Sequence, residues 1–114
     1  MKPTILIIED DPDNARSVHE VADDAGFEVL DAATGLSGVE RFKAHQPDVV
    51  LSDLVLPDID GLDVLRRIRA LNTEVPVLIM TAYASVESGV RAMREGAYDY
   101  ITKPLDLDDI QSKL

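Results

Sequence analysis

Cysteine is absent from this chain of 114 residues, which excludes a disulfide framework, a zinc–thiolate site and a thiol nucleophile. Long apolar runs are missing as well, since none approaches the roughly 20 residues that a membrane span needs. The short apolar run near the N-terminus also lacks the small-residue cleavage site of a secretory signal. These absences predict a cytoplasmic protein that makes no contact with a membrane.

Positive charge is scarce, because 11 Lys and Arg residues stand against 22 Asp and Glu residues, for a net charge of −11. Such an excess opposes contact with nucleic-acid phosphates, so we expect no direct nucleic-acid binding by this domain. Most of the acids are expected on a solvated surface. A few of them directly follow apolar runs, and those need another explanation.

Short apolar runs alternate with amphipathic stretches five times along the chain. The first run, residues 4–8, is β-branched and apolar on both faces, as a strand buried in a parallel sheet should be. Further strands are predicted at 27–32, at the sheet edge, and at 48–53, 75–80 and 98–101. The alternation predicts one α/β domain, a doubly wound five-stranded parallel sheet with helices on both faces.

Apolar residues at helical spacing predict the helices between these strands and their buried positions. Taken helix by helix, the positions are Ala15, Val18, Ala22 and Ala25; Leu36, Val39 and Phe42; Leu62, Leu65, Ile68 and Leu71; and Val86, Val90, Met93 and Ala97. A fifth helix is predicted from Asp106 and has only two to three turns before Leu114. We therefore expect residues 1–114 to be the N-terminal fragment of a longer protein.

Polar side chains gather where the predicted strands end, and doubly wound sheets place their ligands beyond these carboxyl ends. They are Glu9, Asp10 and Asp11 after the first strand, Asp53 at the third, Thr81 at the fourth and Lys103 at the fifth. Converging carboxylates destabilise a fold unless a positive charge intervenes. Lys103 or a hard divalent cation can supply it, and Mg²⁺ suits oxygen ligands of this kind best.

A carboxylate beside Mg²⁺, with a lysine and a hydroxyl nearby, is suited to phosphoryl transfer. Asp53 can attack phosphorus as a nucleophile and become an acyl phosphate. The metal and Lys103 then neutralise charge on the phosphoryl oxygens, and the Thr81 hydroxyl supplies a further hydrogen bond.

Four short motifs resemble those of response regulator receiver domains in two-component systems. They are Glu9-Asp10-Asp11, Ser52-Asp53 followed by Pro57 and Asp60-Gly61, Thr81-Ala82, and Lys103-Pro104. The resemblance covers essentially the whole chain and implies the flavodoxin-like strand order 2-1-3-4-5. The segment from Thr81 to Tyr100 is similar to receivers of the enhancer-binding, nitrogen-regulatory type of transcription activator. If this holds, an ATPase module and a DNA-binding module follow residue 114.

The resemblance implies a role for each site residue. Asp53 would be the phosphoacceptor and Lys103 would contact the phosphoryl group, with a cis bond to Pro104. Asp10, Asp53 and the backbone carbonyl of Val55 would bind Mg²⁺ directly, and Glu9 would act through water. Asp11 remains open between capping the helix that follows and joining the metal shell.

The resemblance also implies a switch and partners. Thr81 and Tyr100 would be the switch pair, with the hydroxyl moving toward the phosphoryl group and the ring turning inward. A cognate sensor histidine kinase would be the phosphodonor. The signal would pass through the face made by the fourth helix, fifth strand and fifth helix. That face would contact an output domain or form a homodimer, and so regulate transcription. The only chemistry of the domain would be its own phosphorylation and dephosphorylation.

Two other classes fit the sequence less well, as does a receiver that is not phosphorylated. A phosphatase with an aspartyl-phosphate intermediate needs a second Asp two residues after the nucleophile, where this chain has Val55. A flavin-binding module needs a Ser/Thr/Gly-rich loop after the first strand, and three acids there would repel its phosphate. An unphosphorylated receiver is disfavoured because no site residue is missing. His19 and His45 are assigned no chemistry.

Overall fold

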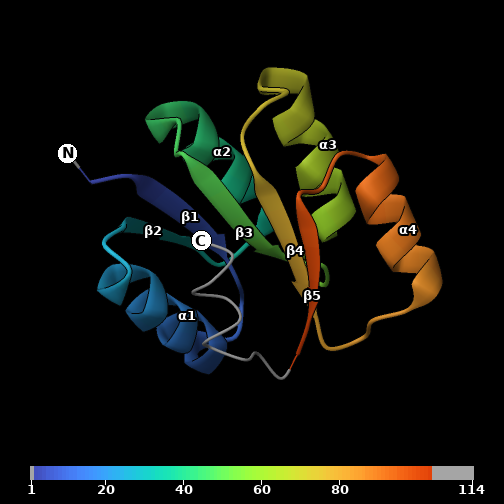
Figure 1. The fold of residues 1–114 in the computed structure, drawn as a ribbon, viewed down its shortest axis with the longest axis horizontal. Helices are drawn as coiled ribbons and strands as arrows, with labels where there is room; N and C mark the ends of the chain where they lie inside the picture. The colour runs from blue at the N-terminus through green and yellow to red at the C-terminus, as the bar shows by residue number, and fades with distance from the viewer. Residues whose placement is uncertain (1, 104–114) are drawn as a thin grey trace.

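The computed structural model describes residues 2–103, which form a five-stranded parallel sheet and four helices (Figure 1). The elements are β1 (Thr4–Ile8), α1 (Pro12–Asp24), β2 (Glu28–Ala32), α2 (Gly35–His45), β3 (Val49–Asp53), α3 (Gly61–Leu71), β4 (Val77–Thr81), α4 (Val86–Arg94) and β5 (Asp99–Thr102). The strand order is β2-β1-β3-β4-β5, so the predicted fold class and order are confirmed. The predicted fifth helix and the Lys103-Pro104 bond lie outside the described residues.

The sheet is buried on both faces, which explains why its central strands are apolar throughout. Ile5 and Ile7 of β1 pack with Val18 of α1 on one face. Leu6 and Ile8 point to the opposite face, where α2 and α3 pack. Figure 1 shows α1 on one side of the sheet, with α2, α3 and α4 on the other. The sheet therefore lies as a middle layer, and the carboxyl ends of its parallel strands meet along one rim.

The second strand lies at the sheet edge, as the sequence predicted. It pairs with β1 alone, and its Glu28 and Asp31 are exposed. The bounds of β1 are as predicted, and those of the other strands differ by one or two residues; β4, for example, begins at Val77, after Pro76 rather than before it. Proline cannot donate a ladder hydrogen bond, so the strand forms beyond it.

The predicted buried stripe on the fourth helix is wrong. Val86 is 85% exposed, Val90 44% and Met93 50%, whereas Ala92 is fully buried. Ala97 is buried, but it lies beyond the end of the helix. The helix turns its small residues toward the sheet and its large apolar residues toward solvent. The prediction failed because periodicity alone does not say which face of a helix packs.

Three further positions predicted as core are exposed. Leu36 lies in the first turn of α2, Leu71 is the last residue of α3, and Ala25 caps the C-terminus of α1. Positions at a helix end have fewer neighbours than those in its middle, although they continue the same stripe. Among residues 2–103, no helix is both long and apolar enough to cross a lipid bilayer.

Candidate functional site

Strand register brings the predicted acids together at the carboxyl rim of the sheet. Ile8 of β1 pairs with Ser52 of β3, so the next residues, Glu9 and Asp53, are neighbours across the two strands. Both side chains are buried, which is unusual for carboxylates that lack a partner. Both positions follow or end predicted strands, and the structure makes them neighbours at one rim.

The backbone at Asp53 and Leu54 is in close contact with Gly61, at the start of α3. Gly61, the first residue of α3, donates its N–H to the Leu54 carbonyl at 2.7 Å. A Cβ atom at Gly61 would lie 2.4 Å from the Asp53 carbonyl oxygen and 2.8 Å from the Leu54 Cα. Both contacts are too short for real atoms, so position 61 requires glycine.

We expect Gly61→Ala to lower the free energy of unfolding by about 1–3 kcal/mol, since backbone must move to admit the methyl group. The matched control is Gly89→Ala, where the new Cβ would meet only the Tyr100 ring at 3.7 Å, an ordinary contact. There the better helix propensity of alanine should leave stability equal or higher. Urea unfolding of the two variants checks both signs, and a Gly61→Ala variant as stable as the wild type would contradict the packing argument.

Lys103 bridges the two buried carboxylates. Its Nζ lies 2.9 Å from Glu9 Oε1 and 2.7 Å from Asp53 Oδ2, and its side chain is only 12% exposed. The Lys103 N–H donates to the Thr81 carbonyl at 2.8 Å, which fixes the start of this side chain beside β4. The second Asp53 oxygen, Oδ1, accepts the Val55 N–H at 3.1 Å. Both oxygens of Asp53 therefore have donors.

The two carboxyl groups differ in proton affinity. Burial raises the pKa of Glu9 to about 7, and the neighbouring Asp53 carboxyl adds to this effect, despite the opposing effect of Lys103. Burial by itself acts to raise the pKa of Asp53 too. Hydrogen bonds with Glu9 and Lys103, joined by the Val55 N–H, outweigh it and hold the pKa of Asp53 below its usual value. In the metal-free protein Asp53 is the ionised member of the pair.

The acidic cluster has the composition of a divalent-metal site. Glu9, Asp10 and Asp53 each offer an oxygen, and these oxygens lie within 4.8 Å of one another. Glu9 Oε2 is buried without a hydrogen-bond partner, although a buried carboxylate oxygen normally has one. A hydrated hard cation would supply both the missing donor and the missing charge, so the residues fit Mg²⁺.

Asp11 caps the helix that follows it, which is one of the two roles that the sequence left open. It is the N-cap of α1, and its side chain accepts the Asp13 N–H. It lines the same hollow as Asp10, but it is outside the group of carboxylates that come within reach of one ion. The geometry therefore favours Asp10 in the metal shell.

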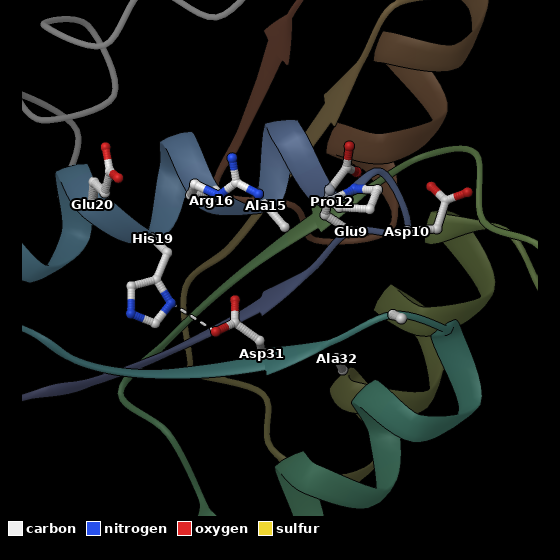
Figure 2. Close-up of a pocket in the computed structure, with 10 residues that line it drawn as sticks. Glu9, Asp10, Pro12, Ala15, Arg16, His19, Glu20, Asp31 and Ala32 are labelled. Carbon is white, nitrogen blue, oxygen red and sulfur yellow. Dashed lines mark hydrogen bonds and ion pairs between the residues drawn. The ribbon is translucent and has the colours of Figure 1, made fainter.

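Two hollows meet at the acidic rim. One, of about 270 Å³, is lined by the acids, Asp53, Val55 and Lys103, together with Ala82 and Tyr83. The other, of about 630 Å³, shares Glu9 and Asp10 and continues along α1 to β2. Figure 2 shows His19 turned toward Asp31 across this second hollow, and their side chains lie 2.7 Å apart. The smaller hollow holds the reactive groups, whereas the larger one extends away from them.

The two predicted switch residues lie behind the rim. Thr81 is fully buried, and its hydroxyl accepts the Tyr83 N–H at 3.0 Å. The Tyr100 ring is half-buried against the core on the α4 side of the sheet. Its hydroxyl lies 2.5 Å from Ser88 Oγ on α4. Neither residue lines the smaller hollow, so a role for them requires movement.

Sequence reasoning missed two contacts. One is the pairing of Tyr100 with Ser88, twelve residues away, for which no local signal exists. The other is Asp58, whose carboxylate accepts the N–H groups of Gly35 and Leu36 and so holds the start of α2. Asp60, which directly precedes Gly61, is the N-cap of α3.

Comparison with known proteins gives consistent matches. Residues 5–114 match the sequence model of the response regulator receiver domain. Regulatory protein AtoC of Escherichia coli (strain K12) is 43% identical over 106 residues, which make up 92% of this chain and 23% of AtoC. Transcriptional regulatory protein ZraR of the same strain is 40% identical over 110 residues, which make up 96% of this chain and 25% of ZraR. The chain thus spans about a quarter of the length of these relatives.

Solved structures agree with the fold. A CheY-like receiver domain protein from Methanospirillum hungatei JF-1 superposes with a TM-score of 0.95 at 31% identity, covering 99% of this chain and 90% of that one. The BeF3-activated DrrB receiver domain gives a TM-score of 0.92 at 26% identity, covering 99% and 94%. These matches confirm the predicted resemblance to response regulator receiver domains, and they include the regulatory proteins AtoC and ZraR.

Proposed function

Because this chain belongs to the response regulator receiver domain family, whose members act in phosphorelay signalling, we propose that Asp53 accepts a phosphoryl group in a Mg²⁺-dependent reaction. One observation carries the proposal: the Asp53 carboxylate is held by Lys103 and the Val55 N–H in a hollow lined by three more acids. A buried carboxylate with donors on both oxygens is fixed in position for attack on phosphorus.

The phosphodonor is a phosphohistidine of a cognate sensor histidine kinase. An Asp53 oxygen forms the new bond to phosphorus, the P–N bond to the histidine breaks, and its electron pair leaves with the imidazole, which takes up a proton. Asp10, Asp53 and the Val55 carbonyl would hold Mg²⁺, with Glu9 acting through water, and the ion would supply positive charge to the phosphoryl oxygens. Lys103 Nζ moves its hydrogen bond from Asp53 to a phosphoryl oxygen.

The output passes through the switch pair. The Thr81 hydroxyl donates to a phosphoryl oxygen, and Tyr100 turns inward into the space that this movement opens. The face of the fourth helix, β5 and the fifth helix then changes and binds an output domain or a second copy. Val86, Val90 and Met93 supply exposed apolar side chains on the α4 part of this face.

We also place this domain, residues 1–114, at the N-terminus of a longer transcription regulator. AtoC and ZraR are each about four times as long as this chain, and ZraR is named as a transcriptional regulatory protein. A cytoplasmic location is part of the same proposal, since the kinase domain and the regulated genes are there. Direct contact with nucleic acid belongs to the output region, because this domain is strongly acidic.

The test of the reaction is labelling by a small acyl phosphate. With Mg²⁺ the wild-type protein should gain one phosphoryl group, visible by intact mass and removed by hydroxylamine. A chelator such as EDTA should prevent the gain. Absence of labelling with Mg²⁺, or equal labelling with EDTA, would contradict the proposed reaction.

We expect the affinity for Mg²⁺ to rise with pH. Glu9, with a pKa of about 7 in the metal-free protein, must lose its proton before it can face the cation. Its ionised fraction rises from about one tenth at pH 6 to about nine tenths at pH 8, so the apparent Kd should fall up to about ninefold. Calorimetric titration at both pH values measures this change.

The same raised pKa has an opposite effect on the metal-free protein. Between pH 4.5 and about 7 the folded protein holds a Glu9 proton that the unfolded chain has lost, so this residue lowers stability as pH rises. Glu9→Gln is the control for both effects, because an amide does not titrate. A wild-type Kd that is the same at pH 6 and pH 8 would contradict this account.

A further inference from the structure

The Ser88 hydroxyl lies between the switch tyrosine and the first turn of α4. Its Oγ is 2.5 Å from the Tyr100 hydroxyl and 3.0 Å from Ser85 Oγ. Ser85 is the N-cap of α4, and Ser88 is the third residue of the helix. The two serines form a reciprocal capping box, in which each side chain accepts the backbone N–H of the other. One hydroxyl therefore serves both the tyrosine and the helix cap.

Ser88 Oγ has several partners for its one proton and two lone pairs. The backbone N–H and the hydroxyl of Ser85 both lie within donating distance of it, and the Ser85 carbonyl lies 3.2 Å away. Either oxygen can be the donor in the contact between Ser88 and Tyr100. In either direction, Ser88 is the hydrogen-bond partner of the tyrosine hydroxyl in this position of the ring.

The packing of Gly89 also places the Tyr100 ring beside the first turn of α4. Gly89 lies next to Ser88, and a Cβ atom there would be 3.7 Å from the Tyr100 ring, so helix backbone and ring are close neighbours. At the other end of the connection from β4 to α4, Thr81 Oγ1 accepts the Tyr83 N–H. The Thr81 hydroxyl thus holds Tyr83 in this connection, residues 82–85, and the Tyr100 hydroxyl holds Ser88 in the first turn of the helix that follows it.

We infer that Ser88 is a positioning residue of the switch, whose hydroxyl holds the Tyr100 ring against the first turn of α4 and links the ring to the helix cap. The inference rests on the proposed function, since it concerns how phosphorylation of Asp53 reaches α4. When Thr81 moves toward the phosphoryl group it releases Tyr83. When Tyr100 turns inward it releases Ser88, and the first turn of α4 is then free to rearrange.

The first experiment uses the unphosphorylated protein and a double-mutant cycle. Ser88→Ala, Tyr100→Phe and the double variant are unfolded in urea. If the two hydroxyls are bonded to each other, Tyr100→Phe should change the unfolding constant about threefold to tenfold less in the Ser88→Ala background than in the wild type. Effects that multiply independently would overturn the inference.

The chain offers a matched control for loss of the cap itself. Ser37 is the third residue of α2 and forms the same capping box with Thr34. Ser37→Ala should weaken its helix to a similar degree, yet its effect should combine independently with Tyr100→Phe. Coupling of equal size at Ser37 would show only a general loss of stability and would overturn the specific role of Ser88.

The second experiment follows the ring itself, by NMR of isotope-labelled tyrosine, with Mg²⁺ and fluoroberyllate as the phosphoryl mimic. Ser88→Ala should shift the equilibrium between the two ring positions about threefold to tenfold toward the switched one. Ser88→Thr keeps the hydroxyl and should restore the wild-type ratio. An unchanged ratio in Ser88→Ala would overturn the inference.

Failure of the inference and failure of the proposed function are distinguishable. If the wild type takes no label at Asp53 but the cycle shows coupling, the phosphorylation proposal fails and the Ser88–Tyr100 contact stands as a structural one only. If labelling is normal and the cycle shows no coupling, the inference about Ser88 fails alone.

Discussion

Asp53→Asn is expected to abolish phosphoryl uptake. The amide is a poor nucleophile, and it removes the charge that attracts both the metal and Lys103, so no acyl phosphate should form. The expected change is a complete loss of the mass gain seen for the wild type under the same donor and Mg²⁺ concentrations. Intact-mass measurement before and after hydroxylamine checks it.

The control for this variant is Asp11→Asn. Asparagine is as good an N-cap as aspartate, so α1 should be retained, and Asp11 is outside the carboxylate cluster. Labelling of Asp11→Asn should therefore stay near that of the wild type, while Asp10→Asn should lose most of it. Labelling that persists in Asp53→Asn would show that the acceptor is another residue. Loss of labelling in Asp11→Asn would show that Asp10 is wrongly assigned as the metal ligand in place of Asp11.

Lys103→Met is expected to have two effects of different origin. Without metal, Glu9 and Asp53 lose their only close cation among the described residues, and the free energy of unfolding should fall by about 1–3 kcal/mol. Protonation of Glu9 limits the loss at neutral pH, since its pKa is already near 7. Added Mg²⁺ should restore part of the lost stability, because the cation replaces the missing charge.

The second effect of Lys103→Met is on the reaction. Without the ammonium group the phosphoryl oxygens lose one of their two sources of positive charge, so labelling or its transmission to α4 should be impaired. Lys43→Met is the matched control, since Lys43 makes only an exposed pair with Glu40 and should change stability by less than about 0.5 kcal/mol. Urea unfolding with and without Mg²⁺ and intact mass give both readouts. A Lys103→Met protein that matches the wild type in both would contradict the assigned role.

The sequence was sufficient for the architecture because two independent signals agreed. Alternating apolar runs and amphipathic stretches specify strands and helices, and parallel strands bring their carboxyl ends to one rim. Glu9, Asp53 and Lys103 could therefore be placed together before any coordinates were known. The strand order itself came from the family resemblance, since the alternation alone allows several orders.

The same reasoning failed where a pattern has two physical outcomes. Val86, Val90 and Met93 have the spacing of a buried stripe, yet an apolar stripe is equally compatible with a surface that a partner covers. Only the contact of Gly89 and Ala92 with the sheet decides which face packs. Side-chain contacts between distant positions, such as Ser88 with Tyr100, depend on the final packing of two elements and leave no local trace.

The charges on β2 bear on how copies of this domain meet in solution. An edge strand has unpaired backbone groups that can pair with a strand of another molecule. Here Glu28 and Asp31 face solvent on that strand, in a chain of net charge −11, so two such edges repel each other. Sheet extension across β2 is therefore opposed at low ionic strength, which protects this edge against pairing with a second copy.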